Sequence, residues 1–142
     1  MSDSKITASP MQDMDEDAKV TFTRNVIAIL DDWKAKDGDQ VILLGLPDNT
    51  RSRQIRSYRQ GSSVFPENDS RVNEFLDHIL GIDDALATSN PCNSAAGGMW
   101  MNRVNNRFKD RTPLNAMIED GINSIVAVRI HLDCAYDWHI SK

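Results

Sequence analysis

The sequence predicts an all-α protein, and three observations support this fold class. Apolar residues recur at helical spacing in several segments, whereas no short run alternates convincingly between apolar and polar residues as a strand does. Glycine, proline, asparagine and aspartate fall between these segments, where helix ends require them. Hydrophobic residues make up 40% and charged residues 26% of the 142 residues, which is the balance of an ordinary soluble domain. We therefore expect one compact domain or two small helical modules that share a core.

The first segment, residues 1–17, differs from the rest of the chain. It is aperiodic, contains Pro10, and holds five acidic residues and one lysine, so most of the formal net charge of −5 lies there. We expect a disordered acidic tail. The body that follows is nearly neutral, which leaves room for a local basic patch.

Residues 18–88 are predicted to form the first helical module. Over residues 18–36 the apolar side chains share one face, as in a helix that packs on a core, and Asp37-Gly38 is expected to end this helix.

A short helix over residues 39–44 and a second over residues 50–60 follow, joined by a tight turn. Gly61 is expected to end the second helix, because glycine accepts the left-handed conformation found past helix ends. Helix, turn and helix in this order have the shape of a helix-turn-helix.

The strongest helical signal covers residues 70–88. Its apolar face supplies either a contact between two copies of the chain or an intramolecular core. Gly81 in its interior costs about 1 kcal/mol relative to alanine unless another group packs closely there. Residues 89–98 are rich in Ser, Asn, Ala and Gly and are predicted to be a flexible linker between modules.

The second module covers residues 99–142. Thr112 before Pro113 predicts the start of a helix, and Gly121 predicts its end. A last helix is expected over residues 122–136. It is apolar around most of its circumference, so it is either buried on several sides or covered by a partner.

The predicted helix at residues 50–60 carries the first functional signal. Ile55 and Tyr58 point one way to pack, and arginines spread over the opposite side, as a helix in a DNA major groove requires. The alternative is a solvated basic face whose arginines pair with local carboxylates. The expected DNA-contacting residues are Arg51, Arg53, Arg56, Tyr58 and Arg59.

The last helix carries the second signal. Arg129 and Asp133 are spaced four residues apart, which predicts either a local surface ion pair or a polar feature at an interface. Trp138 favours the interface, because tryptophan is enriched in binding hot spots.

Nothing in the sequence makes a positive case for catalysis. Cys92, Cys134 and the scattered histidines lack metal-ligand spacing, and Gly97-Gly98 is interpreted as a flexible dipeptide without a phosphate-binding loop around it. We expect a binding protein that is not an enzyme and that holds no metal or cofactor. The absence of a long apolar run and of a signal-peptide pattern predicts a soluble, cytoplasmic protein.

Residues 99–138 follow a distinctive order. A tryptophan-hydrophobe pair on a short helix precedes a polar stretch and an aromatic residue. A basic residue then comes before Pro-Leu, an acidic residue before glycine, and an aliphatic helix closes the segment. The residues in this order are Trp100, Met101, Asn105, Phe108, Arg111, Thr112, Pro113, Leu114, Met117, Asp120, Gly121 and the stretch from Ile125 to Leu132.

This order resembles the toxin-binding domain of the Xre/MbcA/ParS antitoxins, and the upstream half is similar to the family's Xre-like helix-turn-helix. The resemblance covers about residues 20–138. It implies a helix-turn-helix bundle followed by a small helical toxin-binding domain. Such antitoxins of type II toxin-antitoxin systems bind a RES- or ParT-type toxin, which consumes NAD or uses it for ADP-ribosylation, and cover its active site.

The resemblance also implies the partners of the chain: a cognate toxin, operator DNA for autoregulation, and a second copy in a homodimer, with no membrane. The alternative function is a stand-alone helix-turn-helix transcriptional regulator whose second half mediates dimerisation. The expected toxin-binding residues are Trp100, Asn105, Phe108, Arg111, Pro113, Leu114, Met117, Asp120, Gly121, Ile125, Arg129, Tyr136 and Trp138.

Overall fold

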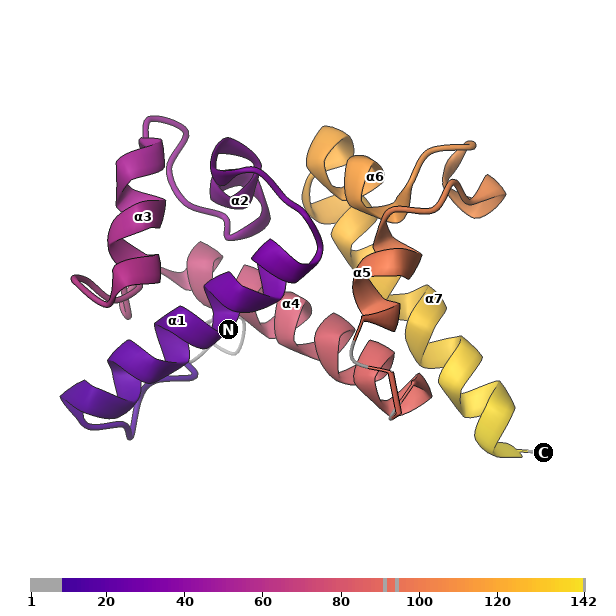
Figure 1. Ribbon diagram of the computed structural model, residues 1–142, viewed down its shortest axis with the longest axis horizontal. Coiled ribbons are helices and arrows are strands. Elements are labelled where there is room, and N and C mark those ends of the chain that lie inside the picture. The colour runs from indigo at the N-terminus through magenta and orange to yellow at the C-terminus, as the bar shows by residue number, and fades with distance from the viewer. Residues whose placement is uncertain (1–8, 91, 94, 142) are drawn as a thin grey trace, which may run out of the picture.

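The computed structural model describes residues 9–90, 92–93 and 95–141, with side chains described as far as Cys134 in the last helix. Within these residues the predicted all-α class is confirmed, with seven α-helices and a 3-10 helix, η2 (Figure 1). The elements are α1 (Glu16–Asp32), α2 (Asp37–Leu43), α3 (Ser52–Gln60), α4 (Ser70–Ser89), α5 (Ala96–Met101), η2 (Asn106–Phe108), α6 (Pro113–Asp120) and α7 (Ile122–Ser141).

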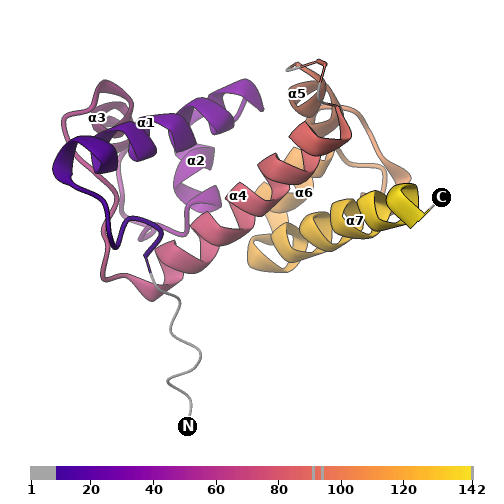
Figure 2. The same cartoon turned by 90° about the horizontal axis from the view of Figure 1, so that it is seen from below.

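Helix α4 runs through the middle of the molecule and is shared by its two halves. Helices α1, α2 and α3 lie to one side of it and α5, α6 and α7 to the other (Figures 1 and 2). Helix α4 packs along α7 and touches α5, and α2 contacts α6. The buried apolar side chains therefore form one continuous core, which contains Trp33 and Leu43 from the first half and Met117 and Ile125 from the second.

The apolar face of α4 is used inside a single chain. Its apolar positions are buried, so the intramolecular alternative holds and this face is not free to join two copies. The buried apolar residues of α4 are Val72, Phe75, Leu76, Ile79, Ile82, Ala85 and Leu86.

Gly81 on α4 lies beneath the Arg129 side chain of α7. A Cβ atom added there would lie 2.6 Å from the Cζ and Nε atoms of Arg129. The close packing that would justify a glycine within this helix is therefore present.

The acidic segment at the N-terminus is shorter than predicted. Residues 1–8 lie outside the described part of the chain, but Met11 is buried in the core. Helix α1 already begins at Glu16, because the Asp15 carboxylate caps it by accepting a 2.8 Å hydrogen bond from the Ala18 backbone nitrogen. The predicted boundary of the tail at residue 17 is therefore wrong for its last part.

The predicted end of the first helix is also wrong. Asp37 and Gly38 do not end α1 but form the first turn of α2. The chain instead reverses at Lys34, which adopts a left-handed φ of 68°, directly after the buried side chain of Trp33. Gly61, with φ of 83°, ends α3 as predicted.

The segment predicted as a flexible linker is partly helical and tightly packed. Helix α5 begins at Ala96, and a Cβ atom on Gly98 would overlap the backbone oxygen of Asp32. The Asn102 side chain donates a 2.8 Å hydrogen bond to the Trp33 backbone oxygen. Gly97-Gly98 therefore allows α5 to approach the end of α1, and its interpretation as a merely flexible dipeptide is wrong.

Among the described residues, no helix combines the length and the apolar character that crossing a membrane requires.

Candidate functional site

Helix α3 presents a basic surface on the side opposite its packing face. Ile55 and Tyr58 are buried, whereas Arg51, Arg53 and Arg56 are exposed. The side chains of these three arginines make no hydrogen bond or ion pair with any described residue. A hollow of about 530 Å³ lies beside them, between α3 and the turn that contains Leu46, Pro47, Asn49 and Thr50. We call Arg51, Arg53 and Arg56 the α3 basic surface.

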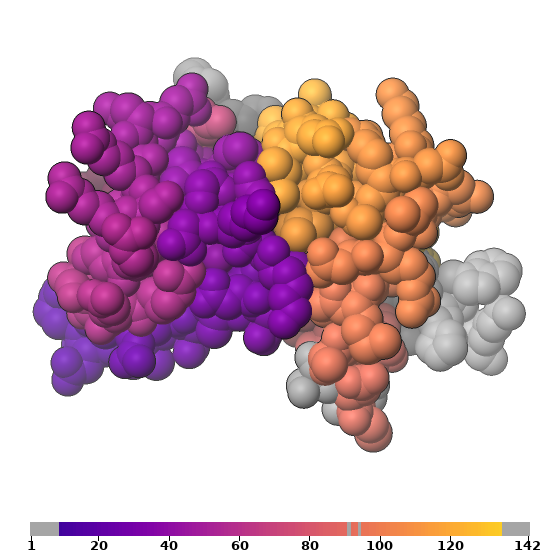
Figure 3. Space-filling model, turned by 45° about the horizontal axis from the view of Figure 1, so that its top comes forward, coloured from indigo at the N-terminus to yellow at the C-terminus, as the bar shows by residue number. Residues whose placement is uncertain are grey.

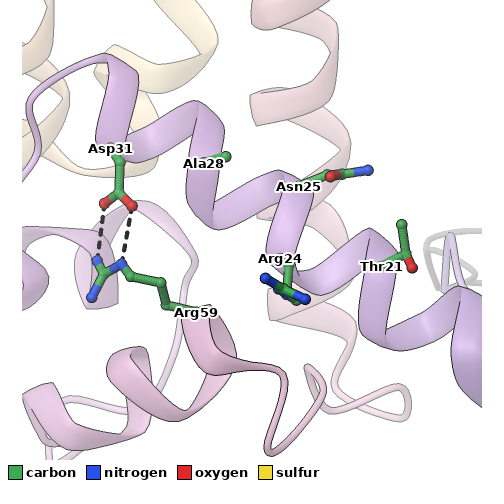
Figure 4. A pocket seen from close by; sticks show the side chains of 6 residues that line it. All are labelled: Thr21, Arg24, Asn25, Ala28, Asp31 and Arg59. Carbon is green, nitrogen blue, oxygen red and sulfur yellow. Dashed lines mark hydrogen bonds and ion pairs between the residues drawn. The ribbon is translucent and has the colours of Figure 1, made fainter.

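Arg59 does not belong to this surface, although it lies one helical turn beyond Arg56. Its Nε and Nη2 atoms donate hydrogen bonds of 3.0 and 2.9 Å to the two carboxylate oxygens of Asp31 (Figure 4). Nη2 also lies 2.8 Å from the Asp37 carboxylate. These hydrogen bonds raise the pKa of Arg59. The guanidinium therefore ties α3 to α1 and α2, and a contact of Arg59 with DNA would have to compete with these two carboxylates.

Asp31 accepts from two groups at once. The buried Gln40 amide donates a 2.8 Å hydrogen bond to Oδ1, the same oxygen that receives the Arg59 Nη2 bond. Burial acts to raise the pKa of Asp31, but the hydrogen bonds from Arg59 and Gln40 outweigh it and lower the pKa. The carboxylate is thus held ionised as a structural acceptor.

A groove of about 330 Å³ lies between α1 and α3 beside this ion pair (Figure 4). Thr21, Arg24, Asn25 and Ala28 line it from α1. Because the Arg59 guanidinium is already bound by carboxylates, the charge that remains available on this groove is that of Arg24.

Tyr58 is also removed from the expected DNA contacts. It is only 4% exposed, and its ring packs edge-to-face on Phe65 with centroids 4.8 Å apart. Burial raises the pKa of its hydroxyl, which a hydrogen bond with Gln54 partly offsets. Tyr58 stabilises the packing of the last turn of α3, because it lies three residues after Ile55 and its ring therefore points into the core with that side chain.

The connection between α2 and α3 departs from the predicted tight turn. It covers residues 44–51, whereas the turn of a helix-turn-helix has about three or four residues. Gly45 shapes its start: its φ is 69°, and a Cβ atom there would lie 2.7 Å from the Phe75 ring. The Phe75 ring, which belongs to α4, thus packs against the backbone at Gly45 and fixes the path of the chain towards α3.

In the second half, an aromatic cluster joins α5, η2 and α7. Trp100 stacks on His131 with centroids 6.1 Å apart, and Phe108 meets both rings edge-to-face. Trp100 is partly buried against the core. Burial lowers the pKa of His131, and the nearby Arg107 charge lowers it further.

Most of the apolar residues expected to bind a toxin are core residues instead. Their helical spacing points them at α4 and at one another, so a partner cannot reach them without unfolding the chain. This corrects the prediction for Phe108, Pro113, Leu114, Met117 and Ile125, all of which are buried.

Arg111 and Asp120 are joined to each other. Arg111 Nη2 lies 2.9 Å from Asp120, Nη1 lies 3.0 Å from Glu119, and Nε donates to the Phe108 backbone oxygen at 2.9 Å. Hydrogen bonds from Arg111 and then Ser124 hold the pKa of Asp120 at about 2. The pair closes the loop before α6 onto the end of that helix, so both side chains have an intramolecular role in addition to any contact with a partner, which stays a prediction.

Asn105 and Gly121 are likewise explained by the fold. The Asn105 side chain accepts a hydrogen bond from the Arg107 backbone nitrogen at the start of η2, and its backbone pairs with Arg111. Gly121, with φ of 70°, makes the turn that lets α7 begin at Ile122.

Arg129 reaches across to α4. Its Nη1 atom lies 2.9 Å from the Asp77 carboxylate and 3.1 Å from His78 Nδ1, whereas the predicted pair with Asp133 is long, at 3.9 Å. The two helices are therefore joined by this side chain. The expected contacts of Tyr136 and Trp138 lie outside the residues whose side chains are described.

Two groups of side chains are exposed on the second half. Met99, Val104 and Ile130 are exposed large hydrophobic residues, at 56%, 62% and 56%. The loop at residues 102–112 carries exposed cations. Of the three exposed hydrophobic residues, only Ile130 could have been indicated in advance, because in the register of α7 it falls about 160° from the buried Val128.

In the described ranges, no group of three or more His, Cys, Asp or Glu side chains is arranged to hold a metal ion. Comparison with known proteins finds no matching protein-family model, no matching curated protein and no matching solved structure.

Proposed function

We propose that this protein is an antitoxin: a binding protein that neutralises a toxin acting on NAD and that contacts DNA through α3. The observation that carries the proposal is the separation of two unlike exposed surfaces on one small chain. Unpaired arginines gather on α3. Three of the four exposed large hydrophobic residues in the described part of the chain belong to the second half, and the fourth is Ile42.

The DNA contact is assigned to the α3 basic surface. Arg53 and Arg56 project from α3 away from the buried Ile55, and Arg51 is exposed at the position before its first turn. Guanidiniums at the start of a recognition helix bind guanine edges and backbone phosphates. Because none of the three is engaged by a carboxylate, binding DNA does not require an internal ion pair to be broken.

The toxin contact is assigned to the exposed hydrophobic residues Met99, Val104 and Ile130. Large apolar side chains that stay exposed on a small soluble protein are typical of the centre of a protein interface. An interface of standard size buries about 800 Å² per partner, which a surface formed by α5, the loop after it and α7 can supply. The order of residues 99–138 that resembles the Xre/MbcA/ParS antitoxins supports a toxin as the partner.

The test is to express the neighbouring reading frame with and without this protein, and to measure growth and cellular NAD. We expect arrest and NAD loss that the parent protein prevents. Ile130→Ser should weaken this protection, whereas the matched variant Ile42→Ser, on the first half, should protect like the parent. A neighbouring protein that is harmless alone, or equal protection by both variants, would contradict the proposal.

The DNA contact is tested separately. Replacing Arg53 and Arg56 by Gln should weaken binding to promoter DNA while leaving NAD protection intact. The stand-alone regulator remains the second candidate, because an exposed apolar face on α7 equally suits a contact between two copies. In that case Ile130→Ser would turn a dimer into a monomer in light scattering and no toxin would be found.

A further inference from the structure

The loop at residues 102–112 carries three further exposed cations, of which Lys109 also acts electrostatically on Asp120. Arg103, Arg107 and Lys109 are exposed, and none of their side chains makes a hydrogen bond or ion pair with a described residue. Asp110 is the one acidic residue within the loop, and it is exposed. Arg111, the fourth cation of the loop, is already bound by Glu119 and Asp120. In a chain of net charge −5, the loop therefore has a local excess of positive charge.

The loop is fixed in shape by its own contacts. Its two ends are joined where the Asn105 backbone nitrogen donates to the Arg111 backbone oxygen at 3.0 Å. The side chain of Phe108 anchors the middle in the core, and Lys109 takes a left-handed φ of 61°. A cluster of charges held in this way loses little conformational freedom when it binds a ligand.

The loop lies on the same face of the molecule as α3. In Figure 1 the start of α3 and the loop between α5 and α6 both lie along the upper edge, at opposite ends. Figure 3, which brings that edge forward, shows the two segments on one face, with residues around 50–60 at one end and the orange segment before α6 at the other. A single extended ligand on this face meets both.

We propose that this loop is a second DNA contact, in which its exposed cations, Arg103, Arg107 and Lys109, bind backbone phosphates of the duplex that α3 reads. The inference rests on the proposed DNA contact of α3. Duplex DNA presents a continuous line of negative charge, so it suits two cationic clusters at opposite ends of one face. An acidic protein surface could also bind the cations of the loop. It would not explain why the loop and the α3 basic surface lie on the same face of the molecule.

Three variants that each remove two positive charges test the inference. Arg107→Gln/Lys109→Gln changes the loop, and Arg53→Gln/Arg56→Gln changes α3. The matched control changes Arg24 on α1 and Arg71 in the first turn of α4, again to Gln. Binding to a fluorescently labelled duplex of mixed sequence is measured by anisotropy over a series of salt concentrations, and circular dichroism checks that each variant is folded.

Each phosphate contact contributes about 0.9 to the slope of log affinity against log salt. We expect the loop variant and the α3 variant each to lower the slope by up to about 1.8, and the control to keep the slope of the parent. If the control variant lowered the salt slope by the same amount, the inference would be overturned, because removing positive charge anywhere on the surface would then weaken DNA binding equally.

The outcomes also separate this inference from the proposed function. If the loop variant keeps the parent's slope while the α3 variant loses it, the second contact is overturned and α3 still binds DNA. If the loop variant keeps its DNA slope but no longer protects against the toxin, the loop binds an acidic protein surface instead. If the parent binds no DNA, the loop contact and the α3 contact with DNA are both overturned, whereas the toxin contact stands or falls by the growth and NAD test.

Discussion

Replacing Gly81 by alanine tests how closely α7 is held against α4. Within a helix that has free space around it, this change stabilises a protein by about 1 kcal/mol, since alanine is the better helix former. At Gly81 the new Cβ would lie 2.6 Å from Cζ of Arg129 and must displace the guanidinium. The displacement weakens the 2.9 Å contact with Asp77, and a surface ion pair of this kind contributes about 0 to 1 kcal/mol. Gain and loss therefore nearly cancel.

The double-mutant cycle separates the two effects. In the parent, Gly81→Ala should change the free energy of unfolding by less than about 0.5 kcal/mol, measured by urea denaturation. In an Arg129→Ala background the obstacle is gone, and the same change should stabilise by about 1 kcal/mol, or about 4 °C in Tm for a chain of this size. The coupling between the two sites is then on the order of 1 kcal/mol.

Equal stabilisation by Gly81→Ala in both backgrounds would refute this reasoning. It would mean that the Arg129 side chain does not lie over Gly81 in solution, and that another contact determines the distance between the two helices.

Three further changes have expected outcomes. Gly98→Ala should destabilise the fold by about 1 to 3 kcal/mol, because its Cβ would overlap the backbone oxygen of Asp32, whereas Gly38→Ala meets nothing within 4 Å and should not destabilise; equal denaturation midpoints would contradict the close approach of α5 to α1. The pKa of Asp120, lowered from 3.8 to about 2, means that its ionised form stabilises the fold above pH 3.8 and that this stability is lost as the pH falls towards 2. Asp120→Asn should remove that part of the pH dependence of thermal unfolding, and a profile identical to the parent's would count against the Arg111 contact. Burial lowers the pKa of His131 below 6.5, so the unfolded chain binds the proton more readily and stability should fall as the pH drops below 6.5. His131→Gln should flatten the profile between about pH 7 and pH 5, and an unchanged profile would exclude His131 as the cause.

The fold class and most helices follow from local patterns, because each helix needs an apolar face and an end signal. The apolar spacing on α4 and the Thr112-Pro113 start of α6 are such signals, and both are confirmed. The turn at Lys34 could not be predicted, since its left-handed conformation is imposed by the burial of Trp33 and not by a glycine.

The candidate contacts were harder to predict, because a residue's position on a helix does not reveal its tertiary partner. Arg56 and Arg59 look equivalent in the sequence, yet only Arg59 meets the Asp31 carboxylate, which lies on another helix. Arg111 and Asp120 were assigned to a partner by resemblance, and the structure joins them to each other. Exposed cations in the loop at residues 102–112 gave no periodic signal, since a loop has no regular face.

Because α4 contributes to the core on both of its sides, the two halves of the chain are expected to unfold together. A ligand that binds either half then stabilises the whole molecule by an amount that grows with the logarithm of its concentration relative to Kd. Toxin held on the second half would protect α3 from local unfolding and proteolysis, and DNA held on α3 would do the same for α7. Under the proposed function, the amount of intact protein in the cell would thus depend on both ligands through one unfolding equilibrium, without any change of shape passing between their sites.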